Sequence, residues 1–123
     1  MRKLTYLFLL PLIAACAGKP AEFRSVSAEN FATIIEDTNV QRVDVRTGPE
    51  YLRGHIDGSM NIDVLKDSFE IKAVSTLDKT RPVAIYCRSG RRSKEASQKL
   101  ADLGYTNIIE FGGILDWKGE IEK

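Results

Sequence analysis

The chain has 123 residues, of which 43% are hydrophobic and 28% are charged, ordinary values for a single folded domain. Its formal net charge is +1, so composition gives no reason to expect a nucleic acid as partner. The sequence contains no long-period repeat and no low-complexity tract.

The first residues differ in character from the rest of the chain. Two basic residues open an almost entirely apolar run that reaches Ala15 and is short for a permanent membrane-spanning helix. The tetrad "IAAC", which ends at Cys16, resembles the bacterial lipobox, in which the signal is cut before the cysteine and the thiol is acylated. We therefore expect a lipoprotein signal peptide at residues 1–15 and a tether at residues 16–23 that begins with lipidated Cys16. An ordinary secretory signal and an uncleaved membrane anchor are the alternatives.

A lipoprotein signal predicts an exported bacterial protein that faces the periplasm and is anchored to a membrane by its acyl chains. The residue after the lipidated cysteine is Ala17 rather than an aspartate, which by the usual sorting pattern favours the outer membrane over the inner one. Lipidation of Cys16 leaves Cys87 as the one free thiol, so no intramolecular disulfide can form. One free cysteine and one histidine also argue against a structural zinc site.

Hydrophobic periodicity and turn residues predict helices that alternate with strands along the remaining chain. The first half contains a helix over 27–37, a strand over 41–46, a short helix ending at Gly54 and a loop entering a short strand over 55–63. The second half contains a helix over 68–77, a strand over 82–87, a helix from 91 to its stop at Gly104, a strand over 106–111 and a short helix around Trp117. This alternation predicts an α/β fold with a mainly parallel sheet, helices on both faces and a ligand site beyond the carboxyl ends of the strands.

Cys87 ends the clearest buried strand and is followed by "RSGRRS". Residues 88–93 could curl around the sulfur with their N–H groups pointing inward, because Gly90 leaves room for a tight loop. The next helix begins there, and three arginines add charge, so we expect a thiol pKa below the usual value of about 8.5. The same loop would attract a small anion. The alternative is an inert core cysteine that precedes a solvated helix start.

Three stretches resemble the rhodanese-type sulfurtransferase domain in their order and spacing: "DVRTGPEYLRGHIDGSMNI" at 44–62, "YCRSGRRS" at 86–93 and "GGILDWKG" at 112–119. The resemblance implies a domain over residues 24–123 with a parallel five-stranded sheet. It also implies that Cys87 accepts a sulfur from thiosulfate or a persulfide donor and passes it to a thiol or cyanide, without a metal or organic cofactor. The substrate-binding residues would be Arg88, Ser89, Gly90, Arg91, Arg92 and Ser93.

Asp44, Arg46 and Glu50 either form a charge network that supports this loop or simply pair at the surface. The loop does not match the cysteine-dependent phosphatases, because Ser93 stands where they carry a phosphate-gripping arginine. By the resemblance, His55 is a structural residue at a turn rather than a catalytic base.

Two alternatives to a small-molecule sulfurtransferase remain open. One is a carrier that relays sulfur from Cys87 to a protein partner, and the other is a non-catalytic rhodanese-like module that binds a partner or an anion. A thiol–disulfide oxidoreductase is less favoured because no resolving cysteine is present.

Overall fold

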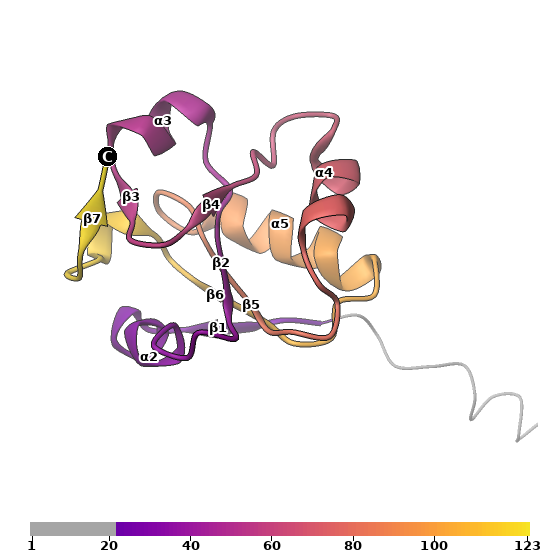
Figure 1. Cartoon of the computed structure of the whole chain (residues 1–123), viewed down its shortest axis with the longest axis horizontal. Coiled ribbons are helices and arrows are strands. Elements are labelled where there is room, and N and C mark those ends of the chain that lie inside the picture. Colours follow the sequence, from indigo (N-terminus) through magenta and orange to yellow (C-terminus); the bar gives the residue numbers. More distant parts are fainter. Residues whose placement is uncertain (1–21) are drawn as a thin grey trace, which may run out of the picture.

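The computed structural model describes residues 22–123, which fold around a sheet of five parallel strands (Figure 1). In their order across the sheet, the strands are β1 (Arg24–Val26), β6 (Ile108–Phe111), β5 (Val83–Tyr86), β2 (Gln41–Asp44) and β4 (Met60–Asn61). The central strand β5 is buried along its whole length, as its continuous apolar sequence predicts. Tyr86 is in register with Asp44 on one side and Phe111 on the other, so three strands end together.

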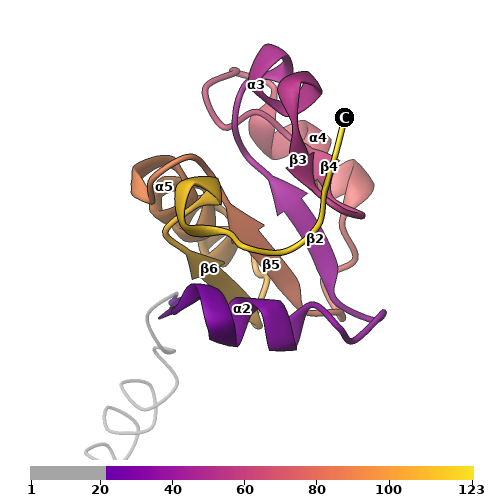
Figure 2. The ribbon, with the colours of Figure 1, turned by 90° about the vertical axis from the view of Figure 1, so that its left-hand side faces the viewer.

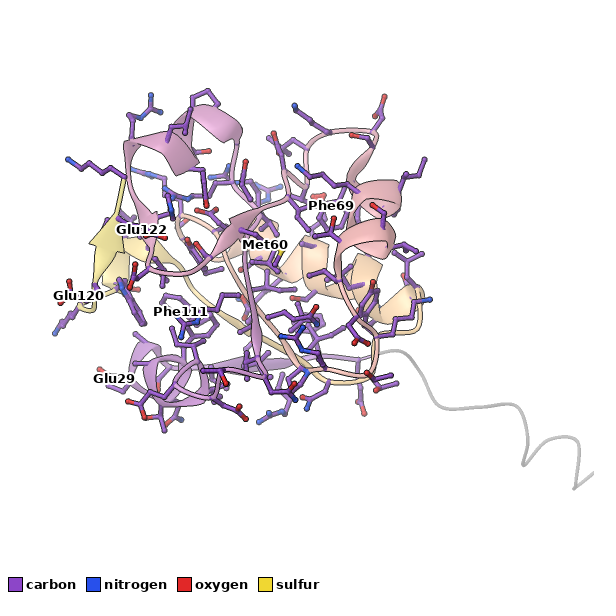
Figure 3. All side chains as sticks on the ribbon, viewed as in Figure 1. Glu29, Met60, Phe69, Phe111, Glu120 and Glu122 are labelled. Atoms are coloured by element: carbon purple, nitrogen blue, oxygen red, sulfur yellow. The ribbon has the colours of Figure 1, made fainter. Side chains whose placement is uncertain are left out.

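Helices cover both faces of the sheet, as predicted. On one face, α4 (Phe69–Thr76) and α5 (Arg91–Asp102) close a hydrophobic cluster that includes Phe69 and Cys87. On the other face, α2 (Ala28–Ile34) closes a second cluster that includes Phe111. Figure 2 shows α2 separated from α4 and α5, and Figure 3 labels Phe69 and Phe111, one from each cluster. The predicted α/β class is therefore confirmed.

A further helix, α3 (Gly48–Arg53), lies beyond the carboxyl end of β2. It begins with a capping box, in which Thr47 Oγ1 accepts from the Glu50 N–H group (3.4 Å) and Glu50 Oε1 accepts from the Thr47 N–H group (3.1 Å). Pro49 occupies the first turn, where backbone N–H groups have no partner within the helix, so its missing N–H group costs no hydrogen bond. Gly54 caps the carboxyl end of the helix. The predicted short helix is therefore confirmed.

The helix predicted over residues 27–37 is shorter than expected. Ser27 caps it by accepting from the Asn30 N–H group (3.1 Å), but α2 ends at Ile34. Asp37 Oδ1 then accepts from the Asn39 N–H group (2.9 Å), which holds the following residues in a turn. Short polar side chains that bind nearby backbone in this way compete with helix formation.

The carboxyl-terminal segment differs from the sequence prediction. A 3-10 helix, η2 (Ile114–Asp116), ends before Trp117, so the prediction of a helix around this residue is wrong in its position. The chain then forms β7 (Ile121–Glu122), which pairs antiparallel with β3 (His55–Ile56). This two-stranded ribbon and α3 gather at one end of the molecule (Figure 1).

The predicted signal peptide, lipidated Cys16 and most of the tether lie outside the described residues. Within residues 22–123, no helix combines the length and the apolar character that crossing a bilayer requires.

Candidate active site

Cys87 directly follows β5, and its side chain is 1% exposed. Its sulfur accepts a hydrogen bond from the Gly90 N–H group, with 3.0 Å between N and Sγ. The Gly112 carbonyl oxygen lies 4.0 Å from Sγ, at the outer limit of a bond to sulfur. The structure thus places the sulfur under the loop that leads into α5, beyond the carboxyl end of the central strand, where parallel sheets bind ligands.

Two glycines allow the chain to close tightly around this sulfur. Gly90 has φ +116, a conformation that side chains disfavour, and α5 begins at the next residue. Gly113 has φ +141, and a Cβ built on it would lie 2.7 Å from the Cys87 carbonyl oxygen and closer still to that of Arg88. A side chain at Gly113 would collide with the backbone of the cysteine loop, and one at Gly90 would be strained by its φ and lie 3.2 Å from the Gly112 carbonyl oxygen.

Burial and hydrogen bonding act in opposite directions on the Cys87 thiol. Burial is the largest influence and raises the pKa, whereas hydrogen bonds from the Ser93 side chain and from the N–H groups of Ser93, Gly90 and Ser89 lower it. Together the hydrogen bonds outweigh burial, so the pKa of Cys87 lies below its usual value. Since the thiolate is the reactive form, this arrangement makes the Cys87 sulfur more nucleophilic at a given pH than an ordinary cysteine.

The Ser93 hydroxyl also has partners other than the sulfur. Ser93 Oγ lies 2.5 Å from Glu110 Oε1 and 3.0 Å from the Gly90 carbonyl oxygen, and all three residues are buried. One hydroxyl proton cannot serve every acceptor, so the backbone N–H groups are the more dependable donors to Cys87. Glu110 was missed in the sequence analysis; a charged residue inside the apolar run "NIIEF" was the available signal.

The three loop arginines have different surroundings. Arg92 forms a two-pronged ion pair with Glu50, with Nη1–Oε1 and Nη2–Oε2 distances of 2.7 and 3.1 Å. Arg88 and Arg91 are exposed and have no ion-pair partner among residues 22–123. The low thiol pKa was expected to come partly from all three charges. Hydrogen bonds are the leading causes that lower it, and of the three arginines Arg92 has a charge interaction with Cys87.

The structure divides the predicted charge network into two separate pairs. Asp44 is fully buried and accepts from Nε (3.0 Å) and Nη2 (2.7 Å) of Arg46, which is itself 6% exposed. Arg46 Nη2 also donates to the Gly54 carbonyl oxygen (2.6 Å), so the Asp44–Arg46 pair links the end of α3 to the end of β2. The Glu50–Arg92 pair instead joins the start of α3 to α5. Only the second pair includes a residue of the cysteine loop.

His55 and Trp117 lie away from the sulfur in structural roles. The His55 ring stacks on Tyr51 at 3.6 Å, and its Nδ1 lies 2.8 Å from the Tyr51 carbonyl oxygen. Trp117 packs against Phe31 and Phe111 beneath α2. Within residues 22–123, neither side chain forms a hydrogen bond with the Cys87 sulfur.

A cleft of about 270 Å³ opens beside the cysteine loop. Its lining residues come from the end of β2, from α3, from the loop and from η2: Arg46, Glu50, Arg53, Gly54, Arg88, Ile114 and Leu115. The cleft borders the backbone of the cysteine loop, because Arg88 lines it and the Ile114 N–H group donates to the Cys87 carbonyl oxygen (2.9 Å). Arg53 and Leu115 were not among the predicted site residues, since neither lies in the cysteine loop.

Comparison with known proteins places this site in a family. The rhodanese-like domain matches residues 27–120. Thiosulfate sulfurtransferase PspE of Escherichia coli is 38% identical over 74 residues, covering 60% of this chain and 70% of that protein. Thiosulfate sulfurtransferase GlpE of Shewanella oneidensis is 30% identical over 98 residues, covering 79% and 94%. A solved structure of a rhodanese with anions from E. coli is 32% identical with a TM-score of 0.59, covering 68% of this chain and 98% of that one.

The chain therefore belongs to the rhodanese-like domain family, and its relatives include named sulfurtransferases.

Proposed function

We propose that the protein is a sulfurtransferase that moves a sulfane sulfur from thiosulfate or a persulfide donor to a thiophilic acceptor through a persulfide on Cys87. The observation that carries this proposal is the Cys87 sulfur held by the Gly90 N–H group at 3.0 Å in a loop of inward N–H donors. The names of two relatives as thiosulfate sulfurtransferases support the same substrate class.

In the first half-reaction, the Cys87 thiolate attacks the outer sulfur of thiosulfate. A new S–S bond forms, the bond to the sulfonate sulfur breaks, and sulfite leaves with the electron pair. The enzyme then holds its negative charge on the terminal sulfur of the persulfide. The N–H groups of residues 89, 90 and 93, which already face the cysteine, are placed to stabilise that charge.

In the second half-reaction, an acceptor thiolate or cyanide attacks the terminal sulfur. The S–S bond to Cys87 breaks, its electron pair returns to the cysteine thiolate, and the acceptor leaves as a persulfide or thiocyanate. The two half-reactions share one covalent intermediate, so ping-pong kinetics are expected. Neither step requires a metal or an organic cofactor.

The test is an intact-mass measurement of the full chain after incubation with thiosulfate. The native protein should gain one sulfur atom and release one equivalent of sulfite, whereas Cys87→Ser should do neither. Cys16→Ser is the matched control, because it removes the other cysteine and should load normally.

The outcomes separate the remaining readings of the site. Thiosulfate binding without a gain in mass would reject the transferase and leave a binding module. Loading followed by discharge to no small thiol, but to a co-purifying protein, would identify a sulfur carrier.

We further propose that the protein is exported in a bacterium and anchored by lipid at Cys16 on the periplasmic side of the outer membrane. The support is the apolar amino-terminal run and the lipobox-like "IAAC". The Cys16→Ser variant should leave the membrane fraction and keep its sulfur-loading activity. Retention of that variant in the membrane fraction would contradict lipid anchoring.

A further inference from the structure

The cleft beside the cysteine loop carries uncompensated positive charge. Of its four charged lining residues, Arg46 is paired with Asp44 and Glu50 is paired with Arg92. The other two, Arg53 and Arg88, are exposed and have no ion-pair partner within residues 22–123. Two exposed arginines without an ion-pair partner therefore line one cleft. Guanidinium groups suit carboxylate partners because their geometry permits two parallel hydrogen bonds.

The cleft is larger than thiosulfate requires. Its volume of about 270 Å³ lies near the lower end of the range of small-molecule sites, about 300–1,000 Å³. Thiosulfate has only five heavy atoms, so a donor of that size would leave much of the cleft unfilled. The remaining space suits a larger second substrate that approaches the loaded cysteine from the same side.

One wall of the cleft is aliphatic. It consists of Ile114 and Leu115, and the Leu115 side chain is 61% exposed. The wall is fixed to the cysteine loop, because Ile114 N–H donates to the Cys87 carbonyl oxygen and Leu115 N–H to that of Arg88 (3.3 Å). A substrate with a short apolar stem and an anionic end would contact both the wall and the free arginines.

We infer that the cleft selects small acceptor thiols that carry carboxylate groups, with Arg53 as a specificity-determining residue. This inference rests on the proposed function, since it names the acceptor for the Cys87 persulfide. Arg53 and Arg88 would bind the carboxylates while the acceptor sulfur points towards Cys87. Their charge also offsets the repulsion between an anionic acceptor and the anionic persulfide.

The transfer step is balanced without an added oxidant or reductant. The acceptor thiolate forms a bond to the terminal sulfur of the persulfide, and the bond between the two persulfide sulfurs breaks. The electron pair of that bond stays on Cys87, which returns to its thiolate form. The product is a persulfide of the carboxylate-bearing thiol, and the total charge is unchanged.

The test uses the full chain loaded with thiosulfate and freed of excess donor. Its discharge is measured with mercaptosuccinate, N-acetylcysteine and N-acetylcysteine amide, and each rate is corrected for the thiolate fraction of the acceptor. We expect kcat/KM to be about two- to fivefold higher for the two carboxylate thiols than for the amide, as one exposed ion pair would produce. This preference should shrink as salt is raised.

Arg53→Gln should lower kcat/KM for the carboxylate thiols by about two- to fivefold and leave the amide unchanged. Arg53→Lys keeps the charge but loses the two parallel hydrogen bonds, so it should retain only part of the preference. Arg24→Gln, which removes an exposed arginine from the edge strand β1, is the control for a general loss of positive charge and should have no effect.

Equal kcat/KM values for the acid and the amide, or an Arg53→Gln effect of the same size on all three thiols, would overturn the inference. Failure to load sulfur at all would instead reject the proposed function, so the two failures can be told apart.

Discussion

The ion pair between Glu50 and Arg92 should stabilise the fold by an amount that depends on pH. The Arg92 hydrogen bond is the main cause that lowers the pKa of Glu50 from 4.5 to about 2, with further lowering from Thr47 and from the Arg92 charge. A shift of that size corresponds to at most about 3 kcal/mol of differential stability. Both side chains are about one-fifth exposed, so solvent screening reduces the expected contribution to about 1–2 kcal/mol.

The sign of the pH dependence follows from the direction of the shift. The pKa of Glu50 is lower in the folded chain than in the unfolded chain, so the ionised pair stabilises the fold above about pH 4.5. The contribution is lost as pH falls towards 2, and more than about half of it is gone by pH 3. Glu50→Gln removes the charge but leaves an amide oxygen that can still accept from Thr47, so the helix cap is preserved.

The assay is urea unfolding of the native chain and Glu50→Gln between pH 7 and pH 3, followed by fluorescence of the single tryptophan. The native chain should be more stable by about 1–2 kcal/mol at pH 7, and the difference should fall by more than about half at pH 3. Glu36→Gln is the control, because Glu36 is exposed and has no ion-pair partner among the described residues. A difference that does not change with pH would refute the argument.

Three further predictions concern the site. In a Cys16→Ser background, alkylation of Cys87 by iodoacetamide should have a lower midpoint pH in the native chain than in urea. Equal midpoints would contradict stabilisation of the thiolate by the hydrogen bonds of the loop. Asp44→Ala should lower the free energy of unfolding by about 3–5 kcal/mol in urea titrations, because it leaves a buried guanidinium unpaired, and a loss below about 1 kcal/mol would refute this. Gly113→Ala should lower the free energy of unfolding by at least about 2 kcal/mol in the same titration and slow sulfur loading, since φ is +141 and a Cβ would collide with the cysteine loop. Native-like stability and loading would show that this close approach is unimportant.

The sequence predicted most helices and strands because their signals are local. The apolar run before Cys87 and the glycine stops at Gly54 and Gly104 each lie within a few residues of the element they define. By contrast, β1 was not predicted because it is three residues long and mostly exposed. The β3–β7 ribbon was also missed, because it pairs two short segments from distant parts of the chain.

The sequence alone determined the fold class and the position of Cys87 at the end of a buried strand, since hydrophobic periodicity and strand–helix alternation are local features of the chain. Only the tertiary structure decided which charges are neutralised. Arg92 meets Glu50 across 42 residues, whereas Arg53 and Arg88 are left free at the cleft. Ion pairing acts over a few ångströms between side chains from different elements, and only the packed sheet brings those elements together.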